Sequence, residues 1–217
     1  MKPRTIVFDL DGTLVDTAPD LAAVANAMLA ERAAPPLAAD VARVTAGQGV
    51  RAMMGAGLTA AGLPLPEEDE WPAIIDDFIA RYVARIAESS RPFKGMPEVL
   101  ETLLQRGHTL AVCTNKRRDL AEELLRALNM VKPFAAIVGG ACVDVRKPHP
   151  KPLLHAIELA GGEVSTSLFI GDSTADIEAA RAAGVPSVLA AWGYLHQPPE
   201  AYGATHIAHA PRDLLAL

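Results

Sequence analysis

Ile6-Val7-Phe8-Asp9-Leu10-Asp11-Gly12-Thr13 joins a short apolar run to two carboxylates and a glycine. A strand that is apolar throughout is buried on both faces, which is typical of a parallel sheet covered by helices. In such sheets, ligands bind outside the carboxyl ends of the strands. The stretch therefore predicts an α/β fold whose first strand delivers Asp9 and Asp11 to a binding edge.

The same pattern returns further along the chain. Apolar runs lead into Thr114-Asn115-Lys116 and into Gly171-Asp172-Ser173-Thr174-Ala175-Asp176, and Lys147 follows a fourth run at 135–138. Because the carboxyl ends of parallel strands meet at one edge of a sheet, we expect four carboxylates, one lysine and two small polar groups in one crevice. Packing alone is a poor explanation for such a set.

Helical and strand patterns alternate in the C-terminal part of the chain. Strands are expected at 109–113, 135–138, 167–170 and 186–190, with helices at 97–106, 118–128, 150–160 and 175–183. This alternation predicts a doubly wound parallel sheet with a Rossmann-like core.

The segment between Val15 and Arg91 contains no convincing strand. Helices are expected from Thr17, which would cap the first helix with Asp20 three residues on, then at 40–61 with a break at Gly47-Gln48-Gly49, and at 71–87. We therefore predict a core domain formed by 1–16 and 91–217, with a small α-helical cap domain, 17–90, inserted after the first strand.

Composition narrows the class of protein. The net charge of −6 and the scattered Lys and Arg residues argue against nucleic-acid binding, which needs a clustered basic face. Cys113 and Cys142 form no C-x-x-C pair and are expected to be reduced. No stretch approaches the ~18 apolar residues of a spanning helix, and no signal peptide is evident. We expect a cytoplasmic protein, a monomer or homodimer, without a membrane partner.

The motifs resemble those of the haloacid dehalogenase-like hydrolase superfamily. The segment Asp9 to Thr17 resembles its first motif, Thr114 its second, Lys147 its third and Gly171 to Asp176 its fourth, in the same order over essentially the whole chain. The helical insert resembles a small cap. Within the superfamily the chain looks most like the phosphoglycolate phosphatase group, through Val112-Cys113-Thr114-Asn115-Lys116, Gly139-Gly140, Lys147-Pro148-His149-Pro150 and Trp192-Gly193-Tyr194.

The first motif suits phosphoryl chemistry. Hydrolysis of a phosphate monoester needs a nucleophile, a cation and a proton donor in one place, because the ester repels anions. We expect Asp9 to be the nucleophile, forming an aspartyl-phosphate. Asp11 would protonate the leaving alkoxide and later deprotonate the attacking water. Gly12 would let the chain turn and expose backbone N–H groups to the phosphate.

The later carboxylates predict a magnesium site. Mg²⁺ prefers oxygen ligands, and Asp172 and Asp176 would complete its site with Asp9. The resemblance implies that Asp11 offers its backbone carbonyl and that Asp176 acts more often through water. The alternative is that Asp172 and Asp176 only stabilise the first turn of a helix, where carboxylates are favoured.

The remaining polar groups would bind the substrate. Thr114 is expected to hydrogen-bond a phosphoryl oxygen, Asn115 to orient the phosphate or leaving group, and Lys147 to neutralise phosphate and hold Asp9 ionised. Lys116, with the two arginines after it, is interpreted as a solvated helix start. In the cap, Arg51 would pair with a substrate carboxylate or would simply be an exposed arginine at a helix break.

Together these features predict a Mg²⁺-dependent phosphomonoester hydrolase that acts on a small phosphorylated metabolite. The first candidate substrate is 2-phosphoglycolate. A sugar-phosphate phosphatase or a phosphomutase of the same fold remains an alternative. A phospho-receiver signalling domain is an alternative of another class, since it also carries Asp, Thr and Lys at strand ends.

Overall fold

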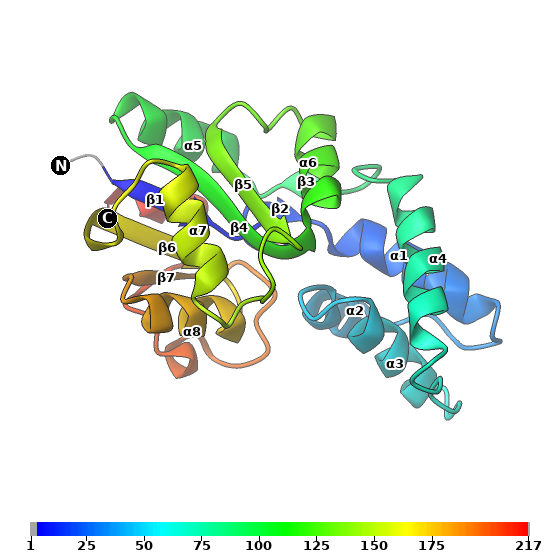
Figure 1. The fold of residues 1–217 in the computed structure, drawn as a ribbon. Coiled ribbons are helices and arrows are strands. Elements are labelled where there is room, and N and C mark those ends of the chain that lie inside the picture. The colour runs from blue at the N-terminus through cyan, green and yellow to red at the C-terminus, as the bar shows by residue number, and fades with distance from the viewer. Residues whose placement is uncertain (1–3, 217) are drawn as a thin grey trace. The chain divides into compact units, whose positions relative to one another are not determined.

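The computed structural model describes residues 4–216, which form two compact units. The core unit consists of 4–16 and 91–216, and the helical unit consists of 17–90 (Figure 1). Within the described residues, no helix is long and apolar enough to cross a membrane.

The core unit contains a parallel sheet, as expected from the apolar runs. Its strands are β1 (Thr5–Phe8), β4 (Thr109–Arg117), β5 (Phe134–Gly140), β6 (Ser167–Gly171), β7 (Ser187–Ala190) and β8 (His206–Ala208). Among residues 4–216 these six strands have the order β5-β4-β1-β6-β7-β8, and every pairing is parallel. Because Phe8 is in register with Val112 and Ile170, β1 and β6 end side by side, whereas β4 continues past them to Arg117.

Helices flank this sheet (Figure 1). They are α5 (Met96–Gln105), α6 (Arg118–Ala127), α7 (Lys151–Leu159) and α8 (Thr174–Ala183), with short 3₁₀ segments at Val164–Thr166, Pro199–Tyr202 and Pro211–Ala216. Side chains of the central strands, such as Val7 and Phe169, pack with Leu153 and Ile157 of α7 in one buried cluster. The strands are therefore anchored in a solvent-free core, and only their ends are available for chemistry.

Two short strands lie at the point where the chain leaves and re-enters the core unit. β2 (Val15–Asp16) pairs antiparallel with β3 (Arg91–Pro92), and the Phe93 amide donates to the Leu14 carbonyl at 3.1 Å. Two-residue strands carry no periodic signal, and the same is true of the short edge strand β8. The pair ties both connections to one another beside the end of β1.

The helical unit contains α1 (Ala18–Ala30), α2 (Ala39–Ala46), α3 (Val50–Ala60) and α4 (Trp71–Val83). The break between α2 and α3 lies at the predicted glycines, whereas α4 ends at Val83 rather than at residue 87. Helices α1 and α3 approach closely, because a Cβ added at Gly57 would lie 2.4 Å from Leu29 Cδ1.

Asp20 fastens the two ends of the helical unit together. Thr17 stands at the predicted N-cap position of α1, but its side chain does not form the capping hydrogen bond of that helix. The fully buried Asp20 carboxylate instead accepts hydrogen bonds from the Ser89 amide at 2.9 Å, the Ser90 amide at 2.8 Å and the Ser90 hydroxyl at 2.6 Å. A carboxylate three residues into the helix therefore serves a contact distant in sequence rather than a local cap.

Candidate active site

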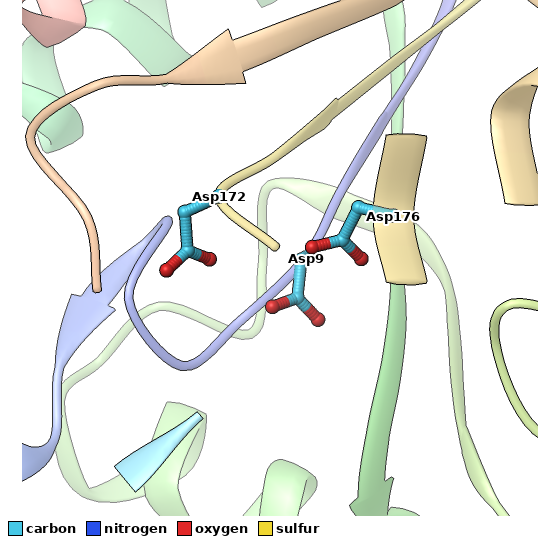
Figure 2. A group of neighbouring side chains, drawn as sticks. All are labelled: Asp9, Asp172 and Asp176. Carbon is cyan, nitrogen blue, oxygen red and sulfur yellow. The ribbon is translucent and has the colours of Figure 1, made fainter. Parts of the chain in front are cut away.

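Three carboxylates meet at the ends of the central strands. Asp9 follows β1, Asp172 follows β6, and Asp176 lies in the first turn of α8. One oxygen from each lies within 4.8 Å of the others, and all three residues are buried (Figure 2). The structure thus brings these predicted residues together in an oxygen-rich group of the kind that a hard divalent cation prefers.

Lys147 neutralises part of this group. Its ammonium donates to Asp9 Oδ1 and Asp176 Oδ1, both at 2.6 Å, and to the Cys113 carbonyl at 2.8 Å. The side chain is 3% exposed, so all three N–H donors of a buried ammonium have protein acceptors. Lys147 therefore links the residue that follows β1, Cys113 within β4 and the start of α8.

One lysine does not fully compensate three buried carboxylates. Burial raises the pKa of Asp9 to about 7, although the charge of Lys147 opposes this rise. Burial, together with the charges of Asp9 and Asp176, also holds the pKa of Asp172 well above its usual range. Burial alone would lower the pKa of Lys147, but the two carboxylates that it contacts raise it. Because excess buried negative charge is costly, the donor set fits a divalent cation.

Asp172 is oriented from two sides. Its Oδ1 accepts from the Thr13 hydroxyl at 2.9 Å, and its Oδ2 accepts from the Tyr194 amide at 2.7 Å. A Cβ at Gly12, where φ is +84°, would lie 2.3 Å from Asp172 Oδ2, and a Cβ at Gly193 would lie 2.3 Å from Asp172 Cβ. The turn after β1 and the loop after β7 can therefore close on this carboxylate only with glycine at both positions.

The loop after β7 contributes residues for which the sequence predicts no role in the site. The Trp192 indole Nε1 donates to the Thr13 carbonyl at 3.0 Å, and the Tyr194 hydroxyl donates to Asp16 Oδ1 at 2.8 Å. These bonds fasten the loop to the segment that follows β1. The available signal was the Trp-Gly-Tyr triplet directly after a buried strand, a polar-tipped aromatic pair around a glycine.

Asp176 has a structural role in addition to its contact with Lys147. Its Oδ2 accepts from the Ser173 amide at 3.0 Å and from the Ser173 hydroxyl at 2.6 Å, which completes a capping box at the start of α8. The capping alternative is therefore realised at Asp176. It is not realised at Asp172, whose bonds go to Thr13 and Tyr194.

Asn115 contacts the backbone of Lys147. Its Nδ2 donates to the Lys147 carbonyl at 3.0 Å, and its Oδ1 accepts from the Lys147 amide at 2.9 Å. Thr114 is buried nearby, and its Oγ1 accepts from the Lys116 amide at 3.2 Å. The Asn115 amide is thus placed to fix the loop that carries the buried ammonium.

Lys116 differs from its sequence-based interpretation. Its Nζ lies 2.9 Å from Asp11 Oδ1, and the two side chains are 8% and 15% exposed. The interpretation of Lys116 as a solvated helix start is therefore wrong, because β4 continues to Arg117 and carries the lysine into the site. Arg117 and Arg118 do remain half-exposed, paired with Asp119 and Glu122.

Arg51 has partners within the helical unit. Its guanidinium lies 2.5 Å from Glu68 Oε2 and stacks over the Trp71 ring, 4.9 Å from the ring centroid. The side chain is half-exposed. These contacts describe its local setting and leave its predicted pairing with a substrate carboxylate as a prediction.

Known proteins are similar to this chain over both the core unit and the helical unit. The family model of the haloacid dehalogenase-like hydrolases matches residues 6–190. A phosphoglycolate phosphatase of Caulobacter vibrioides is 45% identical over 214 residues, covering 99% of this chain and 90% of that protein. An N-acetylmuramic acid 6-phosphate phosphatase of Pseudomonas aeruginosa is 37% identical, covering 99% of this chain and 94% of that protein. The crystal structure of a predicted phosphoglycolate phosphatase from Haemophilus somnus matches with a TM-score of 0.89 and 30% identity, over 100% of this chain and 98% of that one.

Proposed function

Because the chain belongs to the haloacid dehalogenase-like hydrolase family and is a phosphatase, we propose that it is a Mg²⁺-dependent phosphomonoester hydrolase with an aspartyl-phosphate intermediate. The observation that carries this proposal is the buried Asp9 carboxylate, which lies 2.6 Å from the Lys147 ammonium and beside Asp172 and Asp176. A carboxylate that can act as nucleophile, a fixed cation and a set of oxygens suited to a metal are thus available together where β1 and β6 end. Family membership also favours hydrolysis over the phospho-receiver alternative.

In the first half-reaction, a carboxylate oxygen of Asp9 attacks phosphorus and the bond from phosphorus to the ester oxygen breaks. Asp11, two residues on, transfers its proton to the departing alkoxide. Lys147 holds Asp9 in position through the 2.6 Å contact. Thr114, buried within β4, donates its hydroxyl to a phosphoryl oxygen, and the backbone around Gly12 contributes N–H donors.

In the second half-reaction, water attacks the phosphorus of the aspartyl-phosphate. Asp11, now a carboxylate, removes the proton from this water, and Asp9 leaves as a carboxylate. The products are inorganic phosphate and the alcohol. The same side chain therefore serves as acid and then as base, so that no net proton is lost from the enzyme over the cycle.

Asp9, Asp172, Asp176 and the backbone carbonyl of Asp11 would hold the magnesium ion. When bound, a divalent ion reduces the negative charge that opposes attack on a phosphate ester. The donor chemistry supports this assignment, since the oxygens of three buried carboxylates are close together and share one ammonium. Asp176 would act through water, because its oxygens already accept from Ser173 and Lys147.

The substrate is proposed to be a small phosphorylated metabolite, with 2-phosphoglycolate as the first candidate. The support is the 45% identity to a protein named phosphoglycolate phosphatase. A sugar-phosphate phosphatase is the second candidate, supported by the 37% identity to the N-acetylmuramic acid 6-phosphate phosphatase. The helical unit, 17–90, would act as a cap that excludes bulk water during the reaction.

The test is a phosphate-release assay on the full chain with 2-phosphoglycolate, N-acetylmuramic acid 6-phosphate and p-nitrophenyl phosphate, each with and without Mg²⁺. We expect sustained turnover only with the metal and the highest kcat/KM on 2-phosphoglycolate. Asp9→Asn should abolish turnover while the circular dichroism spectrum is unchanged. Near-normal activity of Asp9→Asn would refute the assignment of Asp9 as the nucleophile. A single stoichiometric phosphorylation of the protein without turnover would support the phospho-receiver alternative.

A further inference from the structure

The core unit places a second lysine beside the proposed acid–base residue. Lys147 contacts Asp9 and Asp176, whereas Lys116 Nζ lies 2.9 Å from Asp11 Oδ1. The Lys116 side chain is only 8% exposed, so its charge is largely withdrawn from water. The two ammonium groups are therefore divided between the nucleophile and the residue that handles the leaving group.

The backbone that carries Lys116 is held by close packing. Its amide donates to Thr114 Oγ1 at 3.2 Å. Gly139 of β5 lies against it, since a Cβ added there would be 2.7 Å from the Lys116 carbonyl oxygen and 2.6 Å from Arg118 Cα. The position of this lysine is thus built into the sheet, unlike that of a lysine on an exposed helix.

We propose, resting on the proposed function above, that Lys116 is the specificity-determining residue that binds a carboxylate carried by the carbon next to the ester oxygen. An acid that protonates the ester oxygen must approach it to about 2.6–3.2 Å. Lys116 Nζ lies 2.9 Å from Asp11 Oδ1. When Asp11 contacts the ester oxygen of the substrate, this ammonium can therefore reach groups on the carbon bonded to that ester oxygen. In 2-phosphoglycolate, the carbon that bears the ester oxygen also bears the carboxylate.

The chemistry of an ammonium suits this task. It carries three N–H donors around a single charge, so a substrate carboxylate shares it with Asp11. Charge-assisted hydrogen bonds are strongest where water is excluded, which matches the low exposure of Lys116. In N-acetylmuramic acid 6-phosphate the carboxylate is remote from the ester oxygen. Lys116 therefore favours compact esters of 2-hydroxy acids over phosphorylated sugars.

The sequence offers Arg51 for this role, with an exposed arginine at a helix break as the alternative. In the structure, Arg51 already contacts Glu68 and Trp71 within the helical unit. Lys116 instead stands at the acid–base residue itself. The core unit then selects the group next to the scissile bond, and the helical unit is left to set the size of the rest of the leaving group.

The test compares two esters that differ only beside the ester oxygen: 2-phosphoglycolate and 2-hydroxyethyl phosphate, in which a hydroxymethyl group replaces the carboxylate. Steady-state kinetics are measured with Mg²⁺ on the full-length wild type, Lys116→Met and Lys116→Arg. Lys116→Met should lower kcat/KM for 2-phosphoglycolate about 10- to 100-fold more than for the neutral ester, mostly through KM, which is the size of a charge-assisted hydrogen bond. Lys116→Arg should retain most of the preference.

The matched controls are Arg118→Gln, which removes an exposed cation two residues away, and Arg51→Met. Equal losses on both esters in Lys116→Met would overturn the inference, since Lys116 would then only position Asp11. A selective loss in Arg51→Met alone would overturn it in favour of the helical unit. The inference would also be overturned if the wild type showed no preference for the carboxylated ester, and this result does not depend on whether the variants fold. Absence of any Mg²⁺-dependent turnover in the wild type would instead refute the proposed function.

Discussion

Replacement of Lys147 by methionine should destabilise the core unit strongly. The variant keeps the aliphatic chain but removes an ammonium that donates at 2.6, 2.6 and 2.8 Å to Asp9, Asp176 and the Cys113 carbonyl. Breaking a buried ion pair by removing one partner costs about 3–5 kcal/mol, because a charge is left buried without compensation. We expect a loss of this size in the free energy of unfolding of the metal-free protein.

The loss should also depend on pH. In the folded wild type the pKa of Asp9 is about 7, and the charge of Lys147 holds it from rising further. Without that charge, the folded variant binds an additional proton above pH 7, so its stability falls more steeply than that of the wild type as the pH rises. One extra bound proton changes stability by about 1.4 kcal/mol per pH unit, so the deficit should be about 1 kcal/mol larger at pH 8 than at pH 6.

The assay is guanidinium unfolding of the metal-free protein at both pH values. The two tryptophans lie one in each unit, so a Trp71→Phe background leaves Trp192 as the fluorescent reporter of the core unit. Lys151→Met is the matched control, because Lys151 pairs with Asp144 where both side chains are exposed, and it should cost less than about 1 kcal/mol. A loss for Lys147→Met as small as that of the control would refute the argument that the ammonium is a buried counter-charge.

Three further variants test neighbouring contacts. Asn115→Ala removes both hydrogen bonds to the Lys147 backbone and should cost about 1–2 kcal/mol. Its kcat should fall more than its KM rises, and a rise in KM alone would indicate direct substrate contact instead. Asp20→Ala leaves two amides and a hydroxyl without their acceptor and should cost about 3 kcal/mol in unfolding monitored through Trp71, with Asp77→Ala as an exposed control. Asp172→Asn should stabilise the metal-free protein, since burial favours the neutral form, and should abolish the rise in Tm on adding Mg²⁺. If Mg²⁺ raised the Tm of Asp172→Asn as much as that of the wild type, the assignment of Asp172 as a metal ligand would be refuted.

The sequence predicts the fold well where a signal repeats along the chain. Each predicted apolar run of the core forms a strand, and the parallel order places the ends of β1 and β6 beside the second half of β4, as the motif positions require. The strands without such a signal, β2, β3 and β8, are two or three residues long. Their pairing depends on partners distant in sequence, so neither alternation nor an apolar run marks them in advance.

Side-chain partners were harder to predict than strand ends. A carboxylate in the first turn of a helix can cap that helix or can bind a group distant in sequence, and the local sequence is the same in both cases. The structure shows a different outcome at each position. Asp176 caps α8 and also meets Lys147, whereas Asp20, at the same offset from its N-cap, meets a segment about seventy residues away. The difference lies in what the fold brings next to each carboxylate, which no short window of sequence contains.

Lys116 shows how one additional structural assumption would have changed the interpretation. The run Lys116-Arg117-Arg118 indicates a solvated helix start only if β4 ends at Cys113. The strand instead continues to Arg117, although its pairing with β5 is irregular between Cys113 and Arg117. In this stretch Thr114 and Lys116 are less exposed than Asn115 and Arg117. The lysine two positions beyond Thr114 is therefore turned to the buried side of the strand, where its ammonium contacts Asp11.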